Sequence, residues 1–195
     1  MEFSKVVKKR KSVNAFSGKK ASWKDVLEAI DDAIQGPFAG NHNNLRFLIV
    51  EDGGMIKELA GLCEQNWINE SGLLVVVCSD DTHLENIYGE RGRIYSRQQA
   101  GAAIQTFLLK LTELGLSSCW VGSYADEIVK EKLKIPQHIQ VEAIVPIGYE
   151  RRVKGAGRKP KKKLESVLYW EEWDKTRKPA FFRNREEDYD APEYR

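Results

Sequence analysis

Four clusters of polar residues interrupt an otherwise apolar pattern, and their residue types could do chemistry. They are residues 10–16 (RKSVNAF), 37–44 (PFAGNHNN), 120–124 (WVGSY) and 158–163 (RKPKKK). In the first cluster, Arg10 supplies bidentate donors and Ser12 supplies a hydroxyl, which together suit a phosphate group. A solvated basic face that ends a helix is the plainer interpretation, and these residues alone allow both.

The second cluster is rich in side-chain amides at the entrance of an apolar run. Asn41, Asn43 and Asn44 lie just before LRFLIV, residues 45–50. An asparagine amide places a donor beside an acceptor, which matches a heterocycle edge that presents N–H beside C=O. Asparagines that bond their own backbone in a loop are the alternative.

The third cluster follows a predicted strand at its C-terminal end, where sheets of mixed α and β proteins tend to place ligands. Gly122 would let the backbone approach a ligand closely there. A plain turn between a strand and a helix explains the same residues equally well.

The fourth cluster has five basic residues in six, which is typical of a solvated run or of a nucleic-acid contact. The whole chain balances 31 basic against 29 acidic side chains, for a net charge of +2. Because a general nucleic-acid binder usually has a clear basic excess, no nucleic-acid partner is expected.

Composition narrows the class of protein. With 195 residues, 42% hydrophobic and 31% charged, the chain is long enough for one ordinary globular domain with a sizeable core. No apolar run approaches the roughly 18 residues of a membrane span, so no membrane contact is expected. The N-terminus, MEFSKVVKKRKS, lacks the apolar region of a secretory signal.

The cysteines and histidines indicate neither disulfides nor a metal site. Cys63, Cys78 and Cys119 are odd in number and far apart, which favours free thiols in a reducing cytoplasm. The three histidines are isolated and lack metal-ligand spacing.

Hydrophobic periodicity predicts the elements that must position these clusters. Helices are expected at residues 3–11, 22–35, 55–65, 98–114 and 125–135, and strands at 45–50, 73–79, 117–122 and 139–149. Ser22 and Asp25 have the spacing of a capping box. Residues 80–96 are polar and predict a flexible surface segment. The alternation of helices and strands indicates layered α and β elements, and by itself would favour a parallel sheet.

The composition changes after residue 150. Residues 151–163 are basic and rich in glycine, which predicts a loop. Residues 176–195 are polar but contain two phenylalanines and two tyrosines, which a free tail rarely needs. We therefore expect a domain at residues 1–175 and a C-terminal extension, 176–195, that wraps over the domain or over a partner subunit.

Five motifs, in this order and at these intervals, resemble the FMN-dependent nitroreductase family. Arg10, Ser12 and Phe16 match the family's opening R-x-S-x-[RK]-x-F. Residues 37–47 are similar to its P-S-x-x-N-x-Q-P-W-x-F motif. The remaining three are QAGAAIQTFLLKLTELGLSSCWVGSY (99–124), VEAIVPIGY (141–149) and KKKLESVLYW (161–170). The resemblance covers residues 3–173.

This resemblance implies a fold and an assembly. The expected class is α+β, with three layers in which helices flank a central, mostly antiparallel sheet, and with an extended C-terminal tail. It implies a homodimer that binds FMN at its interface. This overrides the parallel sheet that the alternation alone would suggest.

The resemblance also assigns roles to matched positions. Arg10 and Ser12 are expected at the flavin phosphate and ribityl chain, with Lys11 and Asn14 in the same binding segment. Pro37, Phe38 and Ala39 are expected to pack on the ring from the other subunit, and Asn41 to lie at its polar edge. The backbone of Val121, Gly122 and Ser123 is expected to face the reactive N5 atom, and Arg158 or Lys161 to neutralise phosphate.

Several residues depart from the family pattern. Asn14 stands where a basic residue is usual, near the part of the flavin that gains negative charge on reduction, so reduction should be less favourable. Phe38 replaces a small residue, and Asn43, Asn44 and Leu45 replace Gln, Pro and Trp. These changes leave the substrate class open.

The function implied is that of a cytoplasmic FMN-dependent oxidoreductase. Hydride from NADH or NADPH would pass through flavin N5 to a small planar acceptor, such as a nitroaromatic or a quinone, in a two-step exchange through one site. No catalytic side chain is required, because the cofactor carries the chemistry. The alternative is a module that binds FMN, or senses it, with little turnover.

Overall fold

The computed structural model describes residues 1–151 and 166–176. These belong to two separate units, residues 1–155 and 156–195. In the described part of the second unit, the rings of Tyr169 and Trp173 are in contact, with centroids 4.8 Å apart. The predictions for Arg158, Lys161 and the extension beyond residue 176 lie outside the described residues.

The first unit is built on one four-stranded sheet with the order β1-β2-β4-β3. The strands are β1 (Leu45–Val50), β2 (Leu73–Asp80), β3 (Ser117–Ser118) and β4 (Ile139–Gly148). Every neighbouring pair is antiparallel. This confirms the α+β class, and the parallel sheet suggested by alternation alone is wrong. Alternation identifies the elements, but it does not fix the direction in which each connection returns.

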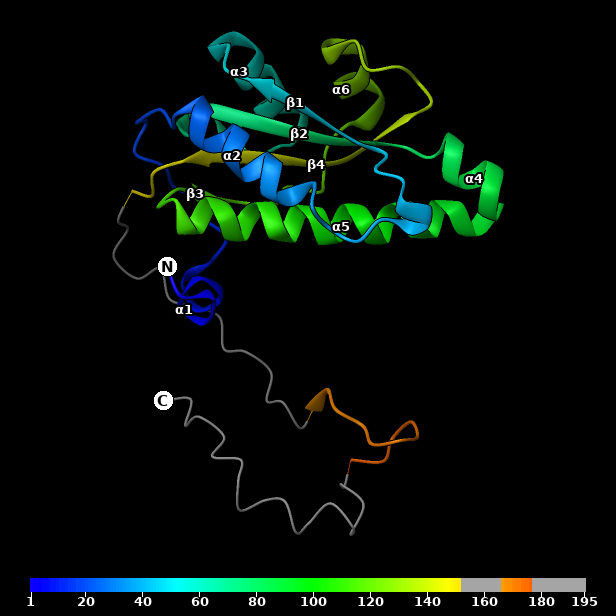
Figure 1. Cartoon of the computed structure of the whole chain (residues 1–195). Helices are drawn as coiled ribbons and strands as arrows, with labels where there is room; N and C mark the ends of the chain where they lie inside the picture. The colour runs from blue at the N-terminus through cyan, green and yellow to red at the C-terminus, as the bar shows by residue number, and fades with distance from the viewer. Residues whose placement is uncertain (152–165, 177–195) are drawn as a thin grey trace, which may run out of the picture. The chain divides into compact units, whose positions relative to one another are not determined.

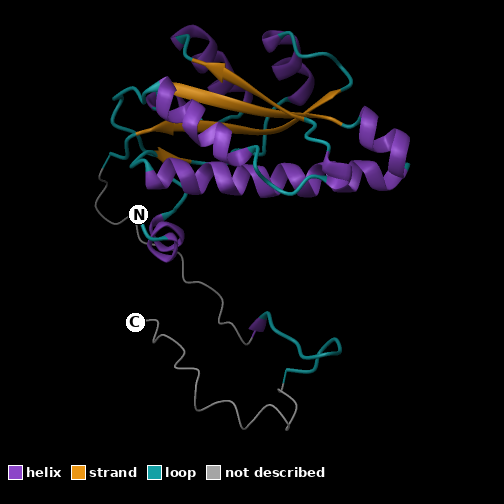
Figure 2. Cartoon of the chain, in the orientation of Figure 1, coloured by secondary structure: helices purple, strands orange, loops and turns teal. Residues whose placement is uncertain are grey.

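Strand β2 lies at the centre of three layers. Its first seven residues are all buried, as the continuous run LLVVVCS predicts for a strand covered on both faces. On one face, Val75 and Val77 pack in a cluster with the apolar sides of α2 (Trp23–Ala33) and α5 (Glu90–Glu113). On the other face, Leu74 and Val76 pack with α3 (Gly53–Leu62) and α6 (Asp126–Leu133). Figures 1 and 2 show the sheet between these two pairs of helices.

The described helices largely match the expected ones. The first, α1 (Phe3–Lys9), lies beside α5 on the side away from the sheet (Figure 1). In α2, the predicted capping box does not form. Ser22 occupies the N-cap, yet its side chain makes no capping bond, and Asp25 N–H bonds the Ser22 carbonyl instead. Among the described residues, no helix is both long enough and apolar enough to cross a membrane.

Most of residues 80–96 are exposed, as predicted, but the stretch is helical. They form α4 (Thr82–Tyr88) and the first turns of α5, which begins eight residues earlier than predicted. The two helices cross so closely that a Cβ at Gly92 would lie 2.3 Å from the Leu84 carbonyl oxygen. Asp81 and Ser96 are buried here despite their polarity. Periodicity failed in this stretch because polar side chains occupy buried positions.

The predicted strand 117–122 is also much shorter than expected. Only Ser117 and Ser118 pair with β4, and Val121 makes one further bridge to Ile144. The chain at residues 12–17 lies alongside instead, with bridges from Ser12 to Ser118 and from Phe16 to Glu150. The first polar cluster therefore lies at the same edge of the sheet as Ser118, two residues before the third cluster.

Candidate functional site

Residues 10–14, called here the edge segment, are held by their backbone. The chain leaves α1 in an extended conformation at Arg10. Val13 N–H donates to the Ser118 carbonyl at 3.0 Å, and the Val13 side chain is buried. The side chains of Ser12 and Asn14 are exposed. Main-chain bonds thus anchor Val13, while the side chains of Ser12 and Asn14 lie where a ligand could reach them.

Lys11 and Cys119 border the edge segment. Lys11 Nζ donates to Glu150 Oε1 at 2.7 Å, which ties the segment to the end of β4. Burial raises the pKa of the half-buried Cys119 thiol, while a hydrogen bond with Ser12 and the charge of Arg10 act in the opposite direction. Arg10 and Ser12 thus lie beside Cys119, immediately before the W-V-G motif.

Part of the backbone at the W-V-G motif is hydrogen-bonded to the sheet. Val121 is buried, and it exchanges two hydrogen bonds of 3.0 Å with Ile144. Gly122 and Ser123 are exposed. Of the three positions expected to face a flavin, these two present backbone to solvent, and Val121 secures them to the core.

Residues 37–41, called here the shelf loop, form a tight turn. Ala39–Asn41 is one turn of 3-10 helix, and Gly40 and Asn41 both have positive φ, at 58° and 55°. Glycine and asparagine are the residues that most readily adopt this left-handed conformation. A Cβ on Gly40 would lie 3.0 Å from the Tyr88 hydroxyl, so α4 approaches the turn closely. The backbone itself therefore accounts for part of this unusual composition.

The shelf loop lies against α5. Ala39 N–H donates to Gln99 Oε1 at 3.0 Å. A cavity of about 240 Å³ opens beside this contact, lined by Pro37, Ala39, Tyr95, Gln98, Gln99 and Ala102. The small residues Ala100 to Ala103 at this part of α5 leave room for the loop. Phe38 is half-buried and packs near Leu45 and Ala100.

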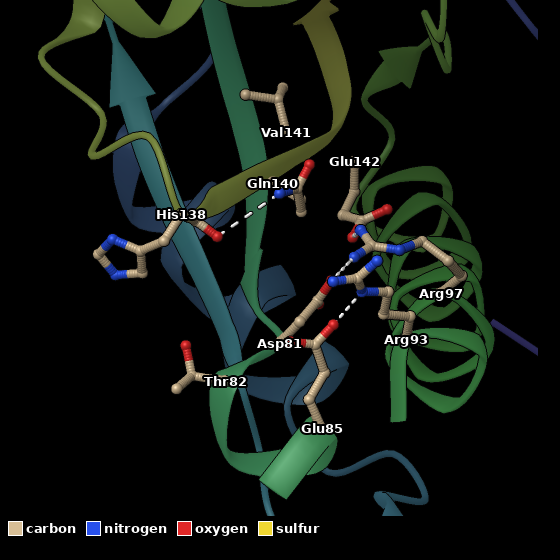
Figure 3. A pocket seen from close by; sticks show the side chains of 9 residues that line it. All are labelled: Asp81, Thr82, Glu85, Arg93, Arg97, His138, Gln140, Val141 and Glu142. Atoms are coloured by element: carbon tan, nitrogen blue, oxygen red, sulfur yellow. Dashed lines mark hydrogen bonds and ion pairs between the residues drawn. The ribbon is translucent and has the colours of Figure 1, made fainter. Parts of the chain in front are cut away.

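A second cavity, of about 650 Å³, lies where α4 and α5 face the start of β4 (Figure 3). Arg97 is ion-paired with both Asp81 and Glu142, and Arg93 is paired with Glu85. Figure 3 shows these side chains converging from α4, α5 and β4. Both arginines of this cavity are thus paired with carboxylates, and the ion pairs join α4, α5 and β4.

The predicted site residues thus form two groups. The edge segment lies beside Ser118 and Cys119, which follow the end of α5, and the N-terminal amine bonds Glu113 Oε1 at 3.0 Å. The shelf loop bonds Gln99, which precedes Glu113 by fourteen residues, or about 21 Å along a helix. The two groups are therefore attached at different points along α5, which Figure 1 shows as one long helix.

Sequence reasoning missed Gln99 and gave Asn44 no role. Both are buried, with exposed fractions of 5% and 1%. The one signal in the sequence was Asn44 itself, a polar residue at a position where the family motif has proline. The Asn43 side chain accepts a hydrogen bond from Leu45 N–H at 3.0 Å, which is the local bonding expected of a loop asparagine.

The chain is similar to known proteins over most of its length. Residues 54–149 match the model of the nitroreductase family. A protein of Archaeoglobus fulgidus, provisionally named NADH dehydrogenase/NAD(P)H nitroreductase, is 28% identical over 77% of this chain and 86% of its own. An iodotyrosine deiodinase of Thermotoga neapolitana is 26% identical over 74% of this chain and 86% of its own.

Solved structures share the fold. A nitroreductase family protein from Clostridium novyi NT aligns with a TM-score of 0.72 at 25% identity, covering 90% of this chain and 96% of that protein. An NADPH:FMN oxidoreductase from Vibrio harveyi aligns with a TM-score of 0.78 at 16% identity, covering 89% and 78%. The second likeness concerns the fold alone.

Proposed function

We propose that the chain is a member of the nitroreductase family, whose model matches residues 54–149, and that it is an FMN-dependent NAD(P)H oxidoreductase that reduces a small planar acceptor. Members of this family are flavin-dependent oxidoreductases. Proposed here for this chain are the cofactor FMN, the acceptor class of nitroaromatics or quinones, and a two-step exchange in which the nucleotide and the acceptor use one site in turn.

One observation carries the proposal: Arg10 and Ser12 lie at the same edge as the exposed backbone of Gly122. A guanidinium and a hydroxyl suit a phosphate, and an exposed glycine suits close approach by a flat ring. A phosphate donor set and an open backbone surface thus follow each other along one sheet edge, which supports a flavin mononucleotide as the ligand.

The residues proposed to hold FMN are those predicted from the sequence. Arg10 and Ser12, with Lys11 and Asn14 in the same segment, would bind the phosphate and ribityl chain. Gly122 and Ser123, secured by Val121, would offer backbone groups to the ring. Arg158 or Lys161 would add positive charge at the phosphate. When bound, FMN supplies hydride chemistry at its N5 atom, so no catalytic side chain is assigned.

We also propose that the enzyme is a homodimer, with the shelf loop of one protomer completing the site of the other. Support comes from α5: the shelf loop bonds Gln99, whereas the N-terminal amine bonds Glu113, about 21 Å further along the helix. Pro37, Phe38 and Ala39 would cover one face of the ring and exclude water from it. Asn41 would lie at the polar edge of the ring.

The boundaries and location are part of the same proposal. We assign residues 1–175 to the FMN-binding domain and residues 176–195 to an extension that wraps the domain or its partner. A cytoplasmic location is supported by Cys63, Cys78 and Cys119, which are all free thiols.

The first experiment is the visible spectrum of the purified protein, followed by extraction and chromatography of any bound flavin. We expect a yellow protein that releases FMN. A colourless protein that takes up no added FMN would overturn the proposal.

The second experiment measures turnover with NADH and NADPH against a nitroaromatic, a quinone and an iodinated phenol. The iodinated phenol is included because one relative is an iodotyrosine deiodinase. We expect parallel double-reciprocal lines at several fixed acceptor concentrations. Intersecting lines would contradict the shared site, and a bound flavin that neither nucleotide bleaches under anaerobic conditions would favour a binding module instead.

A further inference from the structure

Gln99 bonds both ends of the turn in the shelf loop. Its Oε1 accepts from Ala39 N–H at 3.0 Å, and its Nε2 donates to the His42 carbonyl at 3.3 Å. Within the turn, His42 N–H also bonds the Ala39 carbonyl at 3.1 Å. A movement of the Gln99 side chain would therefore shift the turn as one piece.

The orientation of the Gln99 amide is fixed by its partners. A backbone N–H can only donate and a carbonyl can only accept, so Oε1 must face Ala39 and Nε2 must face His42. The second hydrogen of Nε2 goes to Asn44 Oδ1. Each polar group of the Gln99 side chain thus has a defined partner.

Asn44 in turn fixes Gln99. Its Nδ2 donates to the Asp80 carbonyl at 2.9 Å and to Ser96 Oγ at 2.8 Å. Ser96 Oγ donates to Asp81 Oδ1 at 2.6 Å, and Asp81 pairs with Arg97. The chain of bonds runs from the shelf loop to the end of β2 and the ion pairs of Figure 3.

Burial makes this chain of bonds rigid. The exposed fractions are 5% for Gln99, 1% for Asn44 and 0% for Ser96. Hydrogen bonds are stronger in such low-dielectric surroundings, and a broken one leaves a costly unpaired group. A single arrangement of the three side chains is therefore strongly preferred over any other.

We propose that Gln99 is a positioning residue for the flavin site: it sets the place of the shelf loop through Ala39 and His42, with Asn44 holding its amide. The inference rests on the proposed function, because that function supplies FMN as the ligand that the shelf loop would contact. Gln99 acts through the loop and its backbone contacts. Its effect should appear in how FMN is held, in addition to any effect on folding.

The experiment compares Gln99→Leu and Gln99→Glu with the wild-type protein and with Gln105→Leu. Leucine keeps most of the volume but removes every bond to the loop. Glutamate keeps the acceptor for Ala39 N–H and loses both donors. Gln105 is exposed on the same helix and lies outside the site, so its replacement controls for the change of residue type. The measurements are FMN affinity, the visible spectrum of bound FMN, and thermal unfolding of each apoprotein.

We expect Gln99→Leu to bind FMN about ten-fold more weakly, with a shifted flavin spectrum, because a buried hydrogen-bond arrangement is lost. Gln105→Leu should match the wild type. Gln99→Glu should bind weakly at pH 8 and recover towards pH 5, since a protonated carboxyl regains one donor. A purely structural role would lower the unfolding temperature of the apoprotein and leave the FMN affinity of the folded protein unchanged between pH 5 and pH 8.

The outcomes separate the two proposals. If wild-type protein binds FMN and Gln99→Leu has the same affinity and spectrum, the inference is wrong and the proposed function stands. If the wild type binds no FMN, both are overturned. Should Gln99→Leu not fold, the pH profile of Gln99→Glu decides, and a flat profile refutes the inference.

Discussion

The edge segment and the shelf loop are both polar stretches, but they are anchored in opposite ways. In the edge segment, main-chain bonds such as Val13 N–H to Ser118 hold the chain, and Ser12 and Asn14 point outward. At the shelf loop, buried side chains such as Gln99 and Asn44 hold the chain. The first arrangement leaves side chains for a ligand, and the second leaves mainly backbone and apolar surface.

This difference explains for which polar residues a binding role can be inferred from the sequence. Exposed polar side chains at a backbone-anchored edge, such as those of Ser12 and Asn14, can be reached by a ligand, so a binding role is a reasonable hypothesis. Polar side chains in a buried chain of hydrogen bonds have partners inside the protein and are not available to a ligand. Three amides in one loop, residues 41, 43 and 44, therefore have three different surroundings.

The largest expected effect comes from Asn44→Leu, which breaks the anchoring of the shelf loop. The Asp80 carbonyl and Gln99 Nε2 would lose partners inside the protein. We expect a loss of about 3 kcal/mol in the free energy of unfolding, measured by urea denaturation. Asn43→Leu, which removes a local bond only, should cost about 1 kcal/mol. Equal losses of stability in the two variants would contradict the conclusion that the buried hydrogen bonds of Asn44 anchor the shelf loop.

Gly148→Ala tests the anchoring of the edge segment. A Cβ there would lie 2.6 Å from the Ser71 carbonyl oxygen and 3.1 Å from Phe16 Cδ1. We expect a loss of about 2 kcal/mol of stability, because backbone and a core ring must move. Gly61→Ala is the control, since its added Cβ meets nothing within 4 Å and alanine favours a helix. A stable Gly148→Ala protein would mean that the segment tolerates displacement.

Arg10→Ala should separate ligand binding from folding at the edge segment. Loss of a charge-assisted hydrogen bond to phosphate should weaken FMN affinity about ten-fold, with little change in stability. Flavin retained after dialysis gives the affinity, and thermal unfolding gives the stability. Lys9→Ala removes an equal charge one residue away, and equal weakening in both variants would reduce Arg10 to a general electrostatic role.

The thiols give an effect that is absent at neutral pH and develops only in alkaline solution. Burial raises the pKa of Cys78 to about 11. Above about pH 9 the unfolded thiol ionises while the folded one stays protonated, so stability falls as the pH rises towards 11. Cys78→Val should remove up to about 2 kcal/mol of this decline. Parallel stability curves from pH 8 to pH 11 for variant and wild type would contradict it.

Much of the fold followed from simple patterns. The run LLVVVCS predicted a strand covered on both faces, and β2 has that burial. The polar stretch at residues 80–96 was misread because Asp81 and Ser96 are buried through bonds to residues distant in sequence. Periodicity detects apolar faces, so it has no signal for a core made of paired polar groups.

For the candidate site, the sequence identified the types of groups and the structure decided their arrangement. Arg10, Ser12, Asn41 and Gly122 stand out by residue type and spacing, because donors, amides and glycines have local chemical meanings. Only the tertiary structure placed Ser12 beside Ser118 and attached Ala39 to Gln99, sixty residues away. Such contacts form because the sheet and α5 bring segments that are distant in the sequence together. The residue pattern within one segment carries no information about which other segment it will contact.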